Sequence, residues 1–245
     1  MNETHNQART DLVQAIQDLR HGGPLRPQDF PVGPNMRESA VLMLVSAEPD
    51  LLLVQRAATL RAHPGQVAFP GGRVDPEDGD PEDPQDIIHL PAGQGQAAYV
   101  RAALREAHEE TGLDPSGVEI LGLLPRTPLA VSQHQVTPVI GWWKDPVDVG
   151  VVDHGESSLV FRTPIRDLVE PHHRHYAQVQ VTGPNFPRLH HRSPAFRIPR
   201  SITDPAGGSG DVVVWGFTGI LLDRLLAAAG WAKEWDTTDV RPAPQ

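Results

Sequence analysis

The stretch Arg105-Glu106-Ala107-His108-Glu109-Glu110-Thr111-Gly112-Leu113 is the most informative part of this sequence for both fold and chemistry. Its spacing predicts a helix in which Glu106, Glu109 and Glu110 share one face, because residues three and four apart are neighbours on a helix. Like charges at this spacing repel by roughly 0.2–0.5 kcal/mol per pair, whereas a divalent cation would turn the repulsion into ligation. Gly112 suits the left-handed position that ends a helix.

A second stretch, Phe69-Pro70-Gly71-Gly72-Arg73-Val74-Asp75-Pro76-Glu77-Asp78, decides between metal binding and an ordinary solvated acidic face. An isolated acidic helix face would favour the solvated interpretation. Paired glycines, however, let a backbone carbonyl approach a metal ion or a phosphate without a side chain in the way. The two stretches together therefore favour phosphate chemistry that depends on a metal ion.

These two stretches resemble the Nudix box, G-x5-E-x7-R-E-U-x-E-E-x-G-U, in which U is a bulky apolar residue. Gly72 takes the place of the box glycine, Asp78 stands where the box has its first Glu, and residues 105–113 fill the end of the pattern. Residues 79–96 are an acidic and proline-rich insertion that splits the box. We expect this insertion to be a solvated loop, because its composition cannot bury a core.

Residues 52–72 are similar to the signature of the coenzyme A pyrophosphatase branch of this family, L-L-x-x-R-S-x-x-L-R-x-H-x-G-Q-x-x-F-P-G-G. Ala57 replaces the usual Ser. The resemblance continues through residues 136–139 and 214–218, and it covers about residues 37–231. The residues that match the signature are Arg56, Leu60, Arg61, His63, Gly65, Gln66, Phe69, Pro70, Gly71 and Gly72.

The resemblance implies an α/β protein, a Nudix-type α/β/α sandwich around a mixed sheet. It implies a hydrolase that uses Mg²⁺ or Mn²⁺ to cleave coenzyme A or acyl-CoA into 3′,5′-ADP and 4′-phosphopantetheine or its acyl form. Two alternatives stay open at this point. One is hydrolysis of another nucleoside diphosphate derivative such as ADP-ribose, NADH or a dinucleotide. The other is a Nudix fold that serves as a non-catalytic ligand-binding module.

The expected metal ligands are the carboxylates of Glu106, Glu109 and Glu110, joined by the carbonyl of Gly71 as the resemblance implies. Magnesium takes oxygen ligands and completes its shell with water and substrate phosphate oxygens. Arg105 is expected to orient a glutamate rather than bind the substrate. Asp78 could reach a metal ion through a water molecule.

The general base has two candidates. Glu109 is the first candidate within the box. Glu156 lies where related enzymes often carry an acid before a strand, although an ordinary polar turn residue is the slightly favoured interpretation there. The expected catalytic residues are therefore Glu109, Glu106, Arg105 and Glu156.

The expected substrate-binding residues are Arg56, Arg61, His63 and Gln66. Guanidinium groups form bidentate bonds with phosphates, and coenzyme A carries a 3′-phosphate besides its pyrophosphate. Without the surrounding signature, surface salt bridges would be the better interpretation of both arginines. His63 could bond to its own loop or to a phosphate.

Other aromatic residues and histidines give weaker signals. Trp142, Trp143 and Trp215 offer faces for adenine stacking, but their strand-like surroundings favour core packing. The histidines of residues 172–175 and 190–191 suggest a zinc site, yet adjacent histidines without further ligands favour exposed loop residues.

Composition limits the remaining function classes. The chain has 245 residues, with 21 basic and 31 acidic residues and a net charge of −10, which argues against nonspecific binding to nucleic acid. It has no cysteine, so thiolate zinc sites and disulfides are excluded. No segment resembles a signal peptide or a membrane span. We therefore expect a cytoplasmic protein with a small nucleotide substrate and no membrane partner; a homodimer stays open.

Three parts are expected along the chain: residues 1–36 with a helix and a connector, a Nudix domain at 37–232, and a tail at 233–245. In the first part, apolar residues at helical spacing between Leu12 and Leu19 predict a helix that begins at Thr10 or Asp11. The other expected helices are 96–111, 165–169 and 218–229. The expected strands are 38–46, 51–56, 67–69, 118–124, 135–143, 159–163, 176–181, 195–198 and 212–217.

Overall fold

The structure is a computed structural model that describes residues 2–21, 36–60, 62–129, 132–183, 186–203 and 210–244. Its main sheet has the strand order β10-β2-β1-β9-β7, and β3, β4 and β8 pair with β2, β1 and β9. Strand β1 runs parallel to β9 and antiparallel to β2 and β4, so the sheet is mixed as predicted. The strands are β1 (Arg37–Ser46), β2 (Asp50–Arg56), β3 (Val67–Ala68), β4 (Gly71–Arg73), β7 (Val118–Leu123), β8 (Thr127–Leu129), β9 (His134–Trp143) and β10 (Ser157–Pro164).

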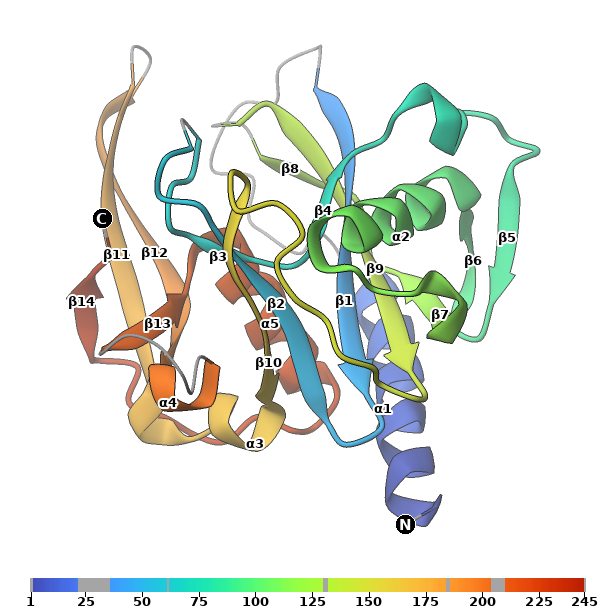
Figure 1. Ribbon diagram of the computed structural model, residues 1–245. Helices are drawn as coiled ribbons and strands as arrows, with labels where there is room; N and C mark the ends of the chain where they lie inside the picture. Colours follow the sequence, from blue (N-terminus) through green and yellow to red (C-terminus); the bar gives the residue numbers. More distant parts are fainter. Residues whose placement is uncertain are drawn as a thin grey trace.

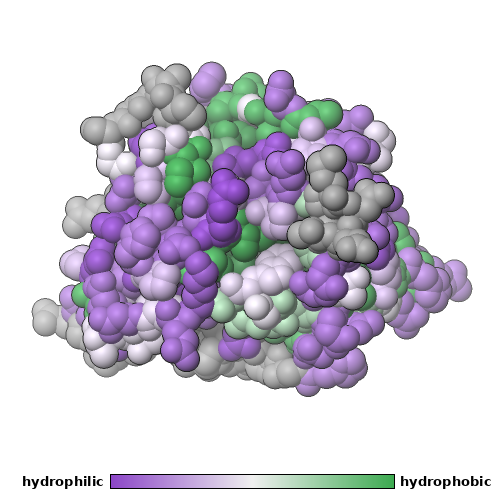
Figure 2. Space-filling view, turned by 90° about the horizontal axis from the view of Figure 1, so that it is seen from below, coloured by the Kyte–Doolittle hydropathy of each residue, from purple (hydrophilic) through white to green (hydrophobic). Residues whose placement is uncertain are grey.

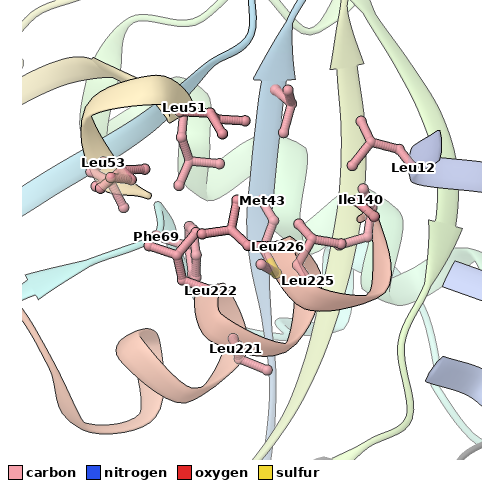
Figure 3. Packing of buried hydrophobic residues seen from close by; sticks show 14 of the residues in the cluster. Leu12, Met43, Leu51, Leu53, Phe69, Ile140, Leu221, Leu222, Leu225 and Leu226 are labelled. Atoms are coloured by element: carbon pink, nitrogen blue, oxygen red, sulfur yellow. The ribbon is translucent and has the colours of Figure 1, made fainter. Parts of the chain in front are cut away.

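Helices cover both faces of this sheet, which confirms the predicted α/β/α sandwich (Figure 1). Side chains of a strand point alternately to the two faces. Leu42 and Leu44 of β1 therefore pack with α2 (Ala97–Thr111). Met43 and Val45 point the other way and join α1 (Asn2–His21) and α5 (Gly216–Ala228) in a second core cluster, part of which Figure 3 shows.

A second sheet packs on the other side of α5, with the strand order β13-β12-β11-β14. Strands β11 and β12, which contain the predicted strands 176–181 and 195–198, form an antiparallel hairpin. An ideal Cβ on Gly219 would lie 2.2 Å from the carbonyl oxygen of Pro194, so a glycine is needed where α5 meets β12. The strands are β11 (Arg174–Gly183), β12 (Phe186–Pro199), β13 (Asp211–Val214) and β14 (Val240–Pro242), and the short helices α3 (Ile165–Leu168) and α4 (Arg200–Thr203) lie nearby.

The strand predicted over residues 212–217 is too long. Strand β13 ends at Val214 and α5 already begins at Gly216, whose backbone has the left-handed φ of 64°. The Gly216 amide donates a 2.8 Å hydrogen bond to Ser193 Oγ, which fixes the turn. A glycine with positive φ ends the extended segment because it tolerates a conformation that other residues avoid.

The insertion at residues 79–96 contains regular structure that the loop prediction missed. Strands β5 (Ile87–Leu90) and β6 (Gly93–Gln96) form an antiparallel hairpin. The Ala92 amide at its turn donates a 2.9 Å hydrogen bond to the carbonyl of Leu121 in β7. Glycine and glutamine make up β6 and have little strand preference, so tertiary pairing rather than local propensity forms this hairpin.

The first helix begins earlier than predicted. Helix α1 already starts at Asn2, so neither Thr10 nor Asp11 is its first residue. The Thr10 hydroxyl donates to the carbonyl of Asn6, one turn earlier, instead of capping a helix start. Leu12 and Ile16 are fully buried against the main sheet and α5. The prediction failed because residues 2–9 are mostly polar and carry no apolar periodicity.

The lower end of the molecule carries apolar surface. A hollow of about 720 Å³ lies between α1, the β1–β2 turn and α3, lined by Ala8, Pro49, Ile165 and Trp231 among others. Figure 2 shows this end from below, with apolar side chains among mainly hydrophilic ones.

In the described part of the chain, no helix is long and apolar enough to cross a membrane.

Candidate active site

Helix α2 carries the acidic residues on the face that its alanines leave free. Its buried side consists largely of Ala98, Ala102, Ala103 and Ala107, small residues that let the helix lie close to the sheet. The helix ends as predicted at Gly112, which has a φ of 72° and donates a 2.8 Å hydrogen bond to the carbonyl of His108. The last two turns of α2 therefore lie directly beside β4.

The glycine pair of β4 brings two of the carboxylates against the backbone. The Gly71 amide donates a 3.0 Å hydrogen bond to Glu110 Oε2. An ideal Cβ on Gly72 would lie 2.3 Å from Cδ of Glu106, so any side chain there would displace this carboxylate. At Gly71 an ideal Cβ would lie 2.3 Å from the carbonyl oxygen of Ala40, and φ is 155°. Position 71 therefore requires glycine, whereas a side chain at position 72 requires the Glu106 carboxylate to move.

The two halves of the box, which the insertion separates in the sequence, are in contact in the structure. Arg105 Nε donates to Asp78 Oδ1 at 3.1 Å and Arg105 Nη2 donates to Asp78 Oδ2 at 2.8 Å, a bidentate ion pair. Asp78 is only 3% exposed, and its carboxylate also accepts a hydrogen bond from the Asp75 amide at 2.9 Å. The base of the β5–β6 hairpin is closed by the Ala97 amide, which donates to the carbonyl of Asp86 at 2.9 Å, and Arg101 Nε donates across the insertion to the carbonyl of Asp78 at 2.6 Å. The hairpin therefore leaves the two halves of the box in contact.

Arg105 also holds two of the three glutamates. Its Nη1 donates to Glu106 Oε1 at 3.1 Å and to Glu109 Oε2 at 3.2 Å, while Nη2 donates to the carbonyl of Arg73 at 3.0 Å. These bonds raise the pKa of the guanidinium above its usual value, with the Asp78 hydrogen bond as the largest cause. Arg105 thus orients carboxylates, and its own donors are turned toward the protein.

Burial alters the acidity of the inner glutamates. Burial raises the pKa of Glu110 to about 7, although the hydrogen bond from Gly71 acts in the opposite direction. Burial also raises the pKa of Glu106, against the influence of Arg105. The third glutamate, Glu109, has 53% of its side chain exposed. Two half-buried carboxylates and one exposed carboxylate therefore lie within the last turns of one helix.

The chemistry of these donors fits a hard divalent cation. Carboxylate and carbonyl oxygens are the ligands that Mg²⁺ and Mn²⁺ prefer, and a cation would offset both the burial and the mutual repulsion of the glutamates. As placed in the described residues, no three acidic or histidine side chains already converge on one point. Glu109 is drawn toward Arg105 and Glu110 toward the Gly71 amide. Metal binding would therefore require these side chains to turn.

Arg56 and Glu156 act on Glu110 with opposite charges. The negative charge of Glu156 raises the pKa of Glu110, and the positive charge of Arg56 lowers it. Glu156 is exposed on the loop before β10, where its carbonyl accepts a 2.9 Å hydrogen bond from Ala57 N. Arg56 Nε is buried and finds no acceptor among the described residues. An oxygen from a substrate phosphate would satisfy this group.

The segment after Arg56 folds back on the same strand. Arg56 N donates to the carbonyl of Gln66 at 3.0 Å, and His63 Nδ1 lies 3.0 Å from Gln66 Oε1. His63 is exposed and has a positive φ of 54°. Three of the four predicted substrate-binding residues therefore lie together at the end of β2. The fourth, Arg61, lies outside the described residues.

A cavity of about 330 Å³ adjoins this group and includes residues that sequence reasoning missed. Arg56, His63 and Gln66 line one part of it. Leu129 and Ser132, which lie one turn apart, also line it together with His191 of β12, and no local sequence pattern marks these three residues. Of the more distant lining residues, Val136 and residues 215–218 lie in stretches that gave a signal in the sequence.

The predictions for tryptophan and histidine had mixed outcomes. Trp142 and Trp143 are buried in the core as predicted, whereas Trp215 lines the cavity. His172 is exposed as expected. His175 is buried in β11 at 4% exposure, so the prediction of an exposed loop residue is wrong there. His175 comes after the loop and lies in strand β11, whose alternate side chains point inward.

Comparisons with known proteins agree with this geometry. A model of the NUDIX domain matches residues 36–140. The uncharacterized Nudix hydrolase NudL of Enterobacter sp. (strain 638) is 37% identical over 183 residues, covering 74% of this chain and 82% of that protein. Its namesake from Cronobacter sakazakii (strain ATCC BAA-894) is 38% identical over 171 residues, covering 69% and 76%. The solved structure of a NUDIX hydrolase from Alicyclobacillus acidocaldarius has 21% identity and a TM-score of 0.42, covering 55% of this chain and 82% of that chain.

Proposed function

The chain belongs to the Nudix hydrolase family, and we propose that it cleaves the pyrophosphate of coenzyme A or acyl-CoA. The products would be 3′,5′-ADP and 4′-phosphopantetheine or its acyl form. The observation that carries this choice is the segment of residues 52–72, because its Gly71 amide donates to Glu110 Oε2 at 3.0 Å and the charge of its Arg56 acts on Glu110. The acidic helix alone would serve any nucleoside diphosphate derivative.

Glu106, Glu109 and Glu110 would hold Mg²⁺ or Mn²⁺ together with the carbonyl of Gly71. When bound, such an ion neutralises phosphate charge and lowers the pKa of a water molecule. The protein's own part is to gather these oxygens on one helix face, from which they would turn toward the ion. Arg105 restrains two of the glutamates, while Asp78 fixes its guanidinium from the other side.

Glu109 is the proposed general base. It is the most exposed of the three helix glutamates, and Arg105 restrains its carboxylate without burying it. A general base must lie within hydrogen-bond reach of the proton that it accepts. Glu156 is the second candidate, because its charge acts on Glu110 from the neighbouring loop.

Arg56 is the central residue of the proposed substrate contacts. Its buried and unsatisfied Nε suits a phosphate oxygen, and its positive charge next to Glu110 counters the repulsion between an acidic site and an anionic substrate. His63, Gln66 and Arg61 complete the proposed binding set. The cytoplasmic location stays a prediction, and a homodimer stays open.

Product analysis with a substrate panel tests this proposal. Purified protein and Mg²⁺ are incubated with coenzyme A, acetyl-CoA, ADP-ribose and NADH, and with each substrate again after EDTA treatment. We expect 3′,5′-ADP from the coenzyme A compounds, loss of turnover in EDTA, and recovery on adding Mg²⁺ or Mn²⁺. Preferential cleavage of ADP-ribose or NADH would contradict the substrate assignment and retain the hydrolase.

A further inference from the structure

Basic side chains gather at the end of the main sheet where β1 and β9 begin, beside β8 (Figure 1). Arg37 of β1 pairs in register with His134 of β9, and Ser39 pairs with Arg73 of β4. Directly paired residues point to the same face of a sheet, and so do residues two apart along one strand. Val41, two residues beyond Ser39, packs against the core cluster that contains α5. All of these side chains therefore lie on the α5 face.

The charges at this end of the sheet act on one another. Burial lowers the pKa of His134. The positive charges of Arg37, Arg73 and His63 lower this pKa further. We call these four residues the basic cluster. Like charges that face each other across paired strands are unfavourable, so an anion bound among them would relieve the repulsion.

Carboxylates do not neutralise the basic cluster within the described part of the chain. Arg37 and Arg73 are exposed, and neither forms an ion pair there. Glu38 follows Arg37 in β1, but its side chain points to the α2 face, where it accepts a 2.7 Å hydrogen bond from the Tyr99 hydroxyl. In a chain with a net charge of −10, such a cluster is a local exception that favours anionic ligands.

The basic cluster adjoins the cavity of about 330 Å³ near the first turn of α5. Leu129 of β8 lines this cavity and pairs in register with His134. His63 belongs to the cluster and also lines the cavity. Arg56 lines it too, and its charge acts on Glu110. Through these shared residues, the cavity links the acidic site to the basic cluster.

We propose that the basic cluster binds a phosphate monoester of the substrate, separate from the pyrophosphate that is cleaved, and so selects coenzyme A over its analogue without the 3′-phosphate. This inference rests on the proposed function. It goes further by assigning substrate specificity to Arg37, Arg73 and His134, which lie outside the signature of residues 52–72. The 3′-phosphate and the pyrophosphate are attached to one ribose, so they require two anion sites that lie close together. Arg73 follows Gly71 by two residues, roughly 7 Å along an extended strand.

The cluster suits a phosphate monoester in both charge and hydrogen bonding. Such a group carries about −1.5 to −2 charges at pH 7. Arg37 and Arg73 supply guanidinium groups, which bind phosphate through two parallel hydrogen bonds. Ser39 Oγ lies 2.7 Å from His134 Nδ1 and holds the imidazole ring in place. When Ser39 donates in this bond, His134 Nε2 carries the ring hydrogen and can donate it to a phosphate oxygen.

The test compares kcat/KM for coenzyme A and dephospho-coenzyme A, two substrates that differ only in the 3′-phosphate. Both are assayed with the wild type and with Arg37→Gln and Arg73→Gln, which remove charge at exposed positions. Arg166→Gln is the matched control, because Arg166 of α3 has 83% of its side chain exposed and lies outside both the cavity and the cluster. Thermal unfolding of each variant identifies a folding defect.

We expect the wild type to prefer coenzyme A about 100-fold, because hydrogen bonds between charged groups contribute about tenfold or more each. Each Gln variant should lower this preference about tenfold, and the control should keep it. Equal kcat/KM for the two substrates in the wild type would overturn the inference and leave the proposed function intact. An unchanged preference in both folded Gln variants would do the same.

A binding measurement separates this inference from the hydrolysis. Isothermal titration calorimetry compares 3′,5′-ADP with 5′-AMP, which lacks only the 3′-phosphate. We expect 3′,5′-ADP to bind the wild type about 100-fold more tightly, and this advantage to shrink about tenfold in each Gln variant. Equal affinity for the two nucleotides would overturn the inference. Cleavage of ADP-ribose with no cleavage of either coenzyme A compound would instead overturn the proposed function, and with it the assignment of the cluster to coenzyme A.

Discussion

The two faces of the main sheet are covered by helices of opposite character. Helix α2 buries a row of alanines and presents acidic residues beside β4. Helix α5 buries leucines between two sheets, and a cavity lies near its first turn. Small residues bring α2 close enough for Gly71 and Gly72 to contact carboxylates directly, whereas α5 packs by its leucines and approaches a backbone closely at Gly219, next to β12.

The side chains next to α2 contribute mainly to the chemistry of the site, and the leucine core under α5 contributes mainly to stability. On the α2 face, polar atoms must lie within hydrogen-bond distance of one another, so small displacements are costly. On the α5 face, apolar packing contributes stability roughly in proportion to buried area. Substitutions among the residues that contact the glutamates should therefore change turnover, and substitutions in the leucine core under α5, away from the cavity, should change the free energy of unfolding.

Glu109→Gln is the most severe change on the α2 face. The amide cannot accept the proton from water, so we expect turnover to fall about 10³-fold while the thermal unfolding temperature stays near that of the wild type. Turnover is measured by product release from coenzyme A. Glu48→Gln at the exposed β1–β2 turn is the matched control and should keep full activity. A loss smaller than tenfold would favour Glu156 as the base.

Leu225→Ala tests the α5 face, where we expect a loss of stability and not of turnover. Leu225 is 1% exposed in the core cluster, so the substitution leaves a cavity and should lower the free energy of unfolding by about 2–5 kcal/mol. Urea unfolding measures this loss. Turnover per folded molecule should stay within about twofold of the wild type. A large loss of turnover in a fully folded sample would show that the two faces are not separate in function.

Gly72→Ala tests the close contact between β4 and α2. The added methyl group would lie 2.3 Å from Cδ of Glu106, and this carboxylate must move to make room. We expect kcat to fall about 10²-fold, because a displacement near 1 Å of a positioned group has an effect of that order. Gly150→Ala is the control, since nothing lies within 4 Å of its ideal Cβ. Equal activity of the two variants would contradict the argument.

Arg126→Ala should have the smallest effect. Arg126 Nη1 donates to Glu82 Oε1 at 2.8 Å and to the Tyr99 hydroxyl at 3.0 Å, which links the insertion to α2 at the surface. Exposed ion pairs contribute about 0–1 kcal/mol, so urea unfolding should show a loss in that range and turnover should not change. A tenfold loss of turnover would mean that the insertion takes part in the reaction.

The ends of the box were predictable from the sequence, but the way they meet was not. Spacing placed Glu106, Glu109 and Glu110 on one helix face and Gly112 at the helix end, because helix periodicity is a local property. The ion pair between Asp78 and Arg105 depends on the β5–β6 hairpin, whose polar β6 carries no strand signal. The lining of the cavity was equally hidden, since it combines short contributions from distant elements.

The closure between Asp78 and Arg105 makes the intervening segment a natural site for change in evolution and in engineering. Asp78 and Arg105 are already joined by a bidentate ion pair, and Arg101 Nε donates to the carbonyl of Asp78 at 2.6 Å, so the length of the segment is not fixed by the geometry of the acidic helix. Doubling a flexible loop costs only about 0.6 kcal/mol in chain entropy. A descendant protein, or an engineer adding a reporter domain, could extend the exposed stretch at Pro84 and Gln85, ahead of the β5–β6 hairpin, and leave the glutamates where they are.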